Sequence, residues 1–326
     1  MITTYALKDG HLVSEEIAKP AEFTDRSAIW IDLVAPTADE IATIEKAFAV
    51  ELPTPDEMKE IEISSRLYQE GRAQIMTSSI VYRIDTTDPQ TGEVAFVVLP
   101  EALITVRFAV PRAFQLYSTR AQSGDIACTT PTAITIGLIE AIIERQADLI
   151  ERLQHRTEVI SHQIFDVKRH DYTREKRHAV SLKEIGKVSV TASRVRDSLV
   201  SLSRLLTYFR NFTMEQKSEA TLRQRIKTAQ QDVQSLGTYV DHISARLTFL
   251  MDATIGLIGI EQNQIIKLFS VAAVMLMPPT LIASVYGMNF KHMPELDYTW
   301  SYPVVIGAMV VSAIVPFIYF KYKGWF

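Results

Sequence analysis

The sequence predicts an α+β sandwich domain followed by long helices and by a hairpin of two transmembrane helices. Three observations predict this class. Up to about residue 108, short runs rich in β-branched and aromatic residues alternate with polar breaks. From residue 131 onward, apolar residues recur at helical spacing and few glycines or prolines interrupt them. Nearly every charge lies before Lys267, so the end of the chain is suited to a solvent other than water.

Composition limits the partners and the location of the first part. The formal net charge is -4, from 34 Lys+Arg against 38 Asp+Glu, and gives no reason to expect nucleic acid as a partner. Cys128 is the single cysteine, which excludes an internal disulfide and a cysteine metal cluster. The N-terminus lacks a basic segment followed by an apolar run, so we expect no cleaved signal peptide and a cytoplasmic location for the first part.

The first domain, residues 1–129, combines strand-like runs with two helix starts. Thr37 and Glu40 have the spacing of a capping box, and Thr54 precedes a proline at the first position of another helix. We therefore expect helices over residues 37–49 and 54–66, set between the strands of a cytoplasmic α+β sandwich. The runs with strand composition are residues 29–34, 73–82, 93–99 and 102–108.

The second domain, residues 130–266, is expected to consist of long packed helices. It opens with Thr130 and Pro131, a capping residue followed by a proline in the first turn. We expect breaks near residues 170–171 and 211–217. The stretch 168–210 is rich in Lys and Arg, and we interpret it as a solvated helical face in preference to a surface that binds nucleic acid or acidic lipid.

Two charge-free segments follow, and each matches the roughly 20 residues that a helix needs to cross a bilayer. We expect a first transmembrane helix over residues 267–286 and a second over residues 302–320. The loop between them, residues 287–301, is too short for a translocated domain, so the two helices form a hairpin.

The charges around this hairpin predict its orientation. Lys267 precedes the first helix and a basic tail, residues 321–326, follows the second, whereas in the loop Lys291 is offset by Glu295 and Asp297. The positive-inside rule therefore places both termini in the cytoplasm.

The first transmembrane helix has features that a simple anchor does not need. Pro278 and Pro279 interrupt it near its middle. Small and polar residues recur along one face, from Asp252 through Asn263 to Thr280. This face suits either helix packing or a pore lining. Two helices per chain cannot enclose a water path, so a pore requires several copies.

Directly after this helix the chain contains Tyr286-Gly-Met-Asn-Phe290, followed by Met293-Pro-Glu-Leu296. With these segments the chain resembles the CorA family of magnesium channels, whose signature is the tripeptide Gly287-Met288-Asn289 at the outer end of this helix. The segments around residues 30–34, 60–66, 260–270 and 277–280 are also similar to the family, so the resemblance covers nearly the whole chain.

The resemblance implies a funnel-shaped homopentamer in the plasma membrane, the inner membrane of a bacterium. It also implies uptake of Mg²⁺, with Co²⁺ and Ni²⁺ as further cargo, through a channel that cytoplasmic Mg²⁺ closes. Mg²⁺ would be both the substrate and a regulatory ligand. No catalytic cofactor is expected, and the other partners would be membrane lipid and divalent cations, Zn²⁺ included. Asp252 stands where some relatives carry glutamine, so the inner end of the pore can differ from theirs.

Mg²⁺ holds its waters tightly, so a channel does better to contact the hydrated ion through neutral oxygens than to strip it. Asn289 offers a side-chain carbonyl for this purpose, and Gly287 lets its backbone approach the axis. The candidate pore residues are Gly287, Met288, Asn289, Thr280 and Asn263 as polar contacts, and Met277, Phe269 and Ile266 as apolar constrictions. The candidate regulatory acids are Asp85, Asp88, Asp232, Asp241 and Asp252.

Three other functions compete with a magnesium channel. A zinc transporter of the ZntB type shares the architecture, but its members tend to depart from the methionine that this chain keeps at position 288. A membrane-anchored enzyme lacks support, because the sequence contains no phosphate-binding loop, zinc-protease motif or nucleophile elbow. A structural or sensory helical protein would need the hairpin only as an anchor.

Overall fold

The computed structural model describes the chain except for residues 9, 18–22, 24–26, 61, 125–128, 166–173, 216–218, 290–292 and 326. The chain divides into two compact units, which we describe separately. The first contains residues 1–171 and 179–250, and the second contains residues 172–178 and 251–326. Cys128 and the break expected near residues 170–171 lie outside the described residues.

The first unit is built on a seven-stranded sheet in the order β2-β1-β3-β7-β6-β5-β4. Only the β3–β7 pair is parallel among the described pairs, and the others are antiparallel. All four runs with strand composition form strands, and three further strands join them. The strands are β1 (Ile2–Lys8), β2 (His11–Ile17), β3 (Ala28–Val34), β4 (Leu67–Glu70), β5 (Ala73–Tyr82), β6 (Gln90–Val98) and β7 (Leu103–Arg107).

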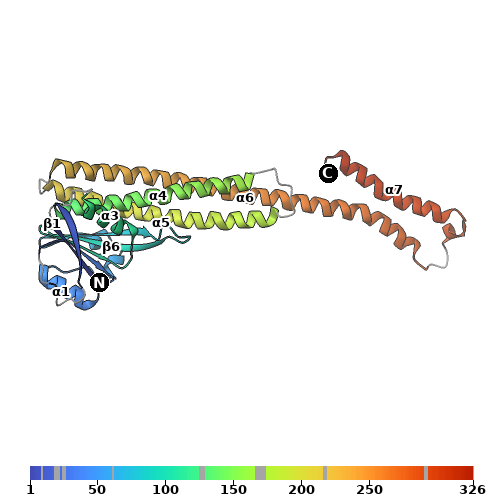
Figure 1. The fold of residues 1–326 in the computed structure, drawn as a ribbon. Coiled ribbons are helices and arrows are strands. Elements are labelled where there is room, and N and C mark those ends of the chain that lie inside the picture. The colour runs from blue at the N-terminus through green and yellow to red at the C-terminus, as the bar shows by residue number, and fades with distance from the viewer. Residues whose placement is uncertain are drawn as a thin grey trace. The chain divides into compact units, whose positions relative to one another are not determined.

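Helices cover both faces of this sheet, which confirms the α+β sandwich (Figure 1). On one face, Ile44 and Phe48 of α1 (Ala38–Phe48) join Ile31 in a buried cluster. On the other face, α3 (Arg112–Ser123) packs its aromatic residues against the sheet, and the ring of Phe114 lies 6.4 Å from that of Trp30. Successive residues of one strand thus supply two apolar layers, as the pleat requires.

The expected helix over residues 37–49 is confirmed, whereas the one over residues 54–66 is wrong. Thr37 and Glu40 form the capping box of α1. Thr54 does bond Glu57 in the same way, but only the 3₁₀ turn Glu57–Lys59 follows, and α2 is the single turn Ile63–Arg66. Arg66 donates to the carbonyls of Met58 and Glu60, and these bonds hold the chain in a loop instead of a helix.

Three long helices follow, α4 (Pro131–Phe165), α5 (Arg174–Glu215) and α6 (Ala220–Tyr286). In the first unit they lie side by side (Figure 1). Arg196 of α5 pairs with Asp241 of α6 at 3.1 Å. The break expected over residues 211–217 begins later than predicted, because Phe209 and Thr213 are buried and extend α5 to Glu215.

The second unit contains the end of α6, the short 3₁₀ helix η3 (Pro294–Asp297) and α7 (Ser301–Tyr322). The Nζ of Lys267 lies 5.8 Å from the ring centroid of Trp325. The start of the first apolar segment is therefore beside the end of the second, and the two form the predicted hairpin. Both helices are long and apolar enough to cross a membrane, and their apolar stretches are almost entirely uncovered within the chain.

Candidate ion pathway

Helix α6 carries most of the candidate pore residues on one continuous helix. The expected interruption at Pro278 and Pro279 is wrong, because the helix runs through both prolines to Tyr286. Each proline removes the amide that would bond four residues back, and the hydroxyl of Thr280 donates to the carbonyl of Leu276 beside them. The hydroxyl proton of Thr280 is therefore used in a hydrogen bond within the helix, and its oxygen can still accept a hydrogen bond from another group.

Because α6 is continuous, the phase of its side chains follows from about 100° per residue. Asn263, Ser270 and Met277 then lie within about 40° of one another, and Asp252 falls on the same stripe. Phe269 lies about 120° from Asn263 and about 80° from Met277, so it falls outside that stripe. The stripe combines an amide, a hydroxyl, a carboxylate and a thioether along one face of a single helix.

The side chains of this stripe are open to their surroundings in the single chain. Met277 and Phe269 are each 69% exposed, and Ile266 is 60% exposed. Asn263 and Asp252 are exposed as well. No described part of the chain covers this face, so it is free to line a path between several copies.

The tripeptide Gly287-Met288-Asn289 directly follows the end of α6. The amides of Gly287 and Met288 donate to the carbonyls of Ala283 and Val285, at 2.9 and 3.3 Å, and so close the helix end. A Cβ at position 287 would lie 3.0 Å from the carbonyl oxygen of Ala283, which explains a glycine there. Among the described residues, no group bonds the exposed side chain of Asn289. Its amide does not cap the helix and remains available for a ligand.

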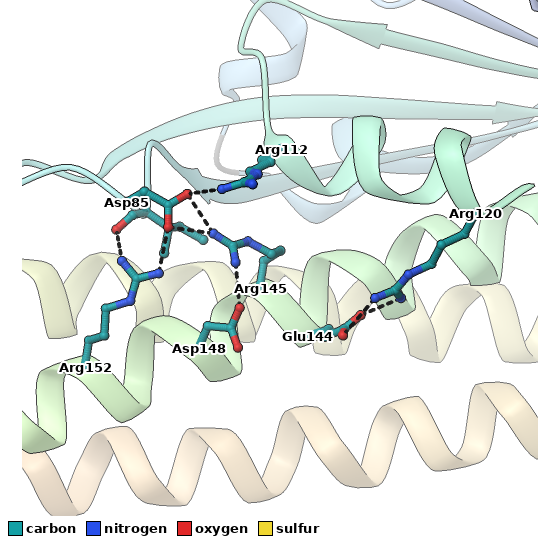
Figure 2. A network of polar contacts seen from close by, with 8 residues as sticks. Asp85, Arg112, Arg120, Glu144, Arg145, Asp148 and Arg152 are labelled. Atoms are coloured by element: carbon teal, nitrogen blue, oxygen red, sulfur yellow. Dashed lines mark hydrogen bonds and ion pairs between the residues drawn. The ribbon is translucent and has the colours of Figure 1, made fainter.

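The candidate regulatory acids differ in what they contact. Asp85 lies on the loop after β5, where Arg152 at 2.8 Å, Arg145 at 2.9 Å and Arg112 at 3.2 Å all reach its carboxylate (Figure 2). Hydrogen bonds from Arg152, joined by those from Arg145 and Arg112, lower its pKa from 3.8 to about 2. Arg145 also binds Asp148 at 2.7 Å. Asp85 is thus already neutralised inside its own chain.

Two more of these acids have partners of their own. Asp88 pairs with Arg194 at 3.1 Å, and Asp241 pairs with Arg196 at the same distance. Asp232 and Asp252 have no ion pair within the described part of the chain. Asp232 lines a groove of 330 Å³ beside Glu140 and Glu144.

That groove is acidic, but each of its two glutamates already forms an ion pair with an arginine. Glu140 pairs with Arg225 at 2.6 Å, and Glu144 pairs with Arg120 at 2.9 Å, which lowers the pKa of Glu144. Within the described ranges, no three His, Cys, Asp or Glu side chains gather closely enough to hold a metal ion. The sequence alone did not reveal these ion pairs, since Asp85 and its arginines are separated by 27 to 67 residues.

Comparisons of the sequence with a family model and with known proteins identify the same family. The model of the family described as CorA-like Mg²⁺ transporter protein matches residues 25–322. The chain is 34% identical to the magnesium transport protein CorA of Pasteurella multocida over 326 residues, which is 100% of both chains. It is 31% identical to the protein of that name from Escherichia coli over 325 residues, again 100% of both.

The fold matches a solved structure over the same length. The complete structure of the CorA magnesium transporter from Methanocaldococcus jannaschii superimposes with a TM-score of 0.73 at 18% identity, covering 100% of this chain and 99% of that one. At this identity the match supports the fold alone.

Proposed function

Since this chain belongs to the family of CorA-like Mg²⁺ transporters, we propose that it is a channel through which Mg²⁺ enters the cell along the polar stripe of α6. The observation that carries the proposal is Asn289. Its amide lies directly beyond the end of an apolar, uncovered helix and makes no hydrogen bond to the described part of the chain. A neutral oxygen in this position suits an ion that arrives hydrated.

The proposed channel is a homopentamer in the bacterial inner membrane, with both termini in the cytoplasm. One chain contributes α6 and α7, which cannot enclose water by themselves. The uncovered stripe of α6 supports an arrangement in which several copies of this helix surround one axis. Lys267 beside Trp325, with Lys321 and Lys323 nearby in the sequence, supports a cytoplasmic location for this end of the hairpin.

Selection would begin at a ring of Asn289 side chains. Their carbonyl oxygens accept hydrogen bonds from the waters around Mg²⁺, so the ion need not lose its tightly held shell. Because Gly287 has no Cβ, the chain can pass close to the carbonyl of Ala283 two residues before Asn289. The oxygen of Thr280 and the amide of Asn263 supply further acceptors along the path. Hydrated Co²⁺ and Ni²⁺ present similar waters and would also pass.

Apolar residues of the same helix would form the constriction. Met277 lies along α6 between Thr280 and Asn263. Copies of its thioether would narrow the path at a level where water finds no strong hydrogen-bond partner. Ile266 and Phe269 are the next apolar candidates toward the cytoplasm. A narrow apolar ring excludes water when closed and needs only a small widening to conduct.

Closure by cytoplasmic Mg²⁺ would use acids that no arginine of their own chain neutralises. Within the described part of the chain, Asp232 and Asp252 meet that condition, whereas Asp85, Asp88 and Asp241 are paired. Like carboxylates of neighbouring copies repel one another until a divalent cation bridges them. The cation therefore binds the closed arrangement more tightly, as a ligand-driven shift requires.

Ion flux into liposomes tests the proposal. The purified protein is reconstituted around a fluorescent Mg²⁺ indicator, and flux is compared for the parent, Asn289→Ala and Gln264→Ala. Gln264 is an exposed amide of α6 next to the stripe, so it is the matched control. We expect Asn289→Ala to abolish Mg²⁺ flux and Gln264→Ala to preserve it.

Oligomer size, measured by size-exclusion chromatography, separates a lost ion contact from a lost fold. Intact oligomers without flux support Asn289 as the selectivity contact. Flux at the parental rate in Asn289→Ala, at equal protein content, contradicts it. No flux in the parent contradicts the proposed function as a whole.

A further inference from the structure

A small pocket beside Asp85 is lined mainly by positive charge. It has a volume of 90 Å³ and is formed by the end of β5 and the loop after it, by the start of α3 and by α4. All of these elements belong to the first unit. The charged side chains that line the pocket are the arginines Arg83, Arg112 and Arg145 and the carboxylate of Asp85.

The charges around this pocket do not balance. Arg152 also reaches Asp85, and Asp148 binds Arg145 at 2.7 Å (Figure 2). With these two neighbours included, four guanidinium groups face two carboxylates, which leaves an excess of two positive charges. Within the described part of the chain, Arg83 forms no ion pair. The pKa of Asp85, which the arginines lower to about 2, reflects the same positive surroundings.

One buried donor of the pocket also lacks an acceptor. The Nε of Arg145 is buried, and no group among the described residues accepts a hydrogen bond from it. The two other nitrogens of this side chain donate to Asp148 and Asp85. Because buried donors in folded proteins nearly always have a partner, this atom indicates a place where an acceptor would bind favourably.

The size and the chemistry of the pocket fit one phosphate group. Pockets for drug-sized ligands hold about 300–1,000 Å³, so a pocket of 90 Å³ admits a tetrahedral oxyanion but not a nucleoside. Guanidinium groups bind phosphate oxygens through paired, charge-assisted hydrogen bonds. No side chain caps the start of α3, so its amides add partial positive charge. A phosphate dianion would also cancel the excess of two positive charges.

We propose that the pocket lined by Arg83, Arg112 and Arg145 binds a phosphate group, either of inorganic phosphate or of a larger phosphorylated molecule. The three arginines come from the loop after β5, from α3 and from α4, so the bound anion would hold these elements together and stabilise the first unit. It would share guanidinium groups with Asp85. The anion and the carboxylate therefore compete, and removing the charge of Asp85 should strengthen phosphate binding.

Isothermal titration calorimetry of the full-length protein in detergent tests the proposal. Sodium phosphate is titrated at neutral pH and constant ionic strength in Mg²⁺-free buffer, so that neither a bound divalent cation nor general screening contributes. Sodium nitrate is the control anion, because it carries a single charge and is planar. The variants are Arg112→Gln and the matched control Arg120→Gln. Both are exposed arginines of α3 that pair with a carboxylate, and only Arg112 lines the pocket.

We expect the parent to bind one phosphate per chain. Arg112→Gln should bind it at least about tenfold more weakly, because hydrogen bonds from a charged group are lost. Arg120→Gln should stay within about twofold of the parent, since its charge is exposed and outside the pocket. Asp85→Asn should bind phosphate about tenfold more tightly, because a competing negative charge is gone.

No binding by the parent, equal heat with nitrate, or an equal loss in the two arginine variants overturns the proposal. Unchanged or weaker binding by Asp85→Asn does so as well, once circular dichroism has shown that the variant is folded. Adenosine diphosphate separates the two sources of the phosphate group. Binding tighter than that of inorganic phosphate, and still dependent on Arg112, supports a nucleotide, whereas weaker binding supports free phosphate. The assay needs no ion transport, so a parent that binds phosphate without conducting Mg²⁺ contradicts only the proposed function.

Discussion

Replacing Asp85 by asparagine separates two roles for this residue, an ion pair within the chain and a metal ligand. The substitution keeps the shape of the side chain and removes its charge. Arg112, Arg145 and Arg152 then surround a neutral amide, and of the three only Arg145 retains a carboxylate among the described residues, that of Asp148 (Figure 2). We expect the loop after β5 to open more often.

The pKa of Asp85 gives the size of the effect. A fall from 3.8 to about 2 corresponds to an upper bound of about 2.4 kcal/mol. Since 46% of the side chain is exposed, solvent screening reduces this to about 1 kcal/mol. The carboxyl group has a lowered pKa in the folded chain, so its contribution is complete above pH 3.8 and is lost as the pH falls toward 2.

Hydrogen exchange measured by mass spectrometry at neutral pH provides the assay. A loss of about 1 kcal/mol predicts roughly fivefold faster exchange in peptides from the β5–β6 loop. Asp88→Asn, in the same loop, is the control, because that side chain is 72% exposed and has one ion pair. We expect less than about a twofold change there.

Mg²⁺ decides between the two roles. If Asp85 acts through its arginines, the faster exchange is the same with and without Mg²⁺. An effect that appears only in the presence of Mg²⁺ would refute this reasoning and return Asp85 to the list of metal ligands.

Three further predictions concern the gate, the helical core and the sensor. Met277→Gly should raise Mg²⁺ leak into liposomes at low Mg²⁺, and no increase would move the constriction to another residue. Gly137→Ala should destabilise the first unit by about 1–3 kcal/mol in thermal unfolding, because its Cβ would clash with a buried aromatic ring of α3. Gly186→Ala, where a Cβ meets nothing within 4 Å, should be neutral or stabilising. Neutralising Asp232 and Asp252 together should abolish protection by Mg²⁺ against protease, and full protection in that variant would exclude them as the sensor.

Much of the fold could be predicted because its signals are local. The core strands are continuous apolar runs, and the charge-free segments are long enough to identify by length alone. Strand β2 was missed because it is an edge strand with mostly exposed residues and no apolar run. Helix α3 was missed because no side chain caps its start and its sequence is polar apart from the residues it buries.

The candidate site likewise has a part that could be predicted from the sequence and a part that could not. The stripe of α6 and the tripeptide after it follow from spacing along one helix, so the sequence was sufficient to find them. The prolines were misinterpreted because their missing amides are visible in the sequence, whereas the continuation of α6 through both of them is visible only in the structure. The sequence favours Asp252 and Asp232 as sensors by their positions, but it does not reveal that the other three acids are paired, because their arginine partners lie far away in the chain.

The difference between paired and unpaired acids limits how a single chain can respond to Mg²⁺. Asp85 is held by three guanidinium groups, and a cation would have to displace them to bind it. Among the described residues, Asp232 and Asp252 face no such competition, and neither lies among enough acids to hold a metal ion. In the proposed oligomer, a divalent ion would gain further carboxylate oxygens there from a neighbouring copy. Such a sensor would respond to the spacing between copies, and that spacing would also set the width of the proposed path lined by α6.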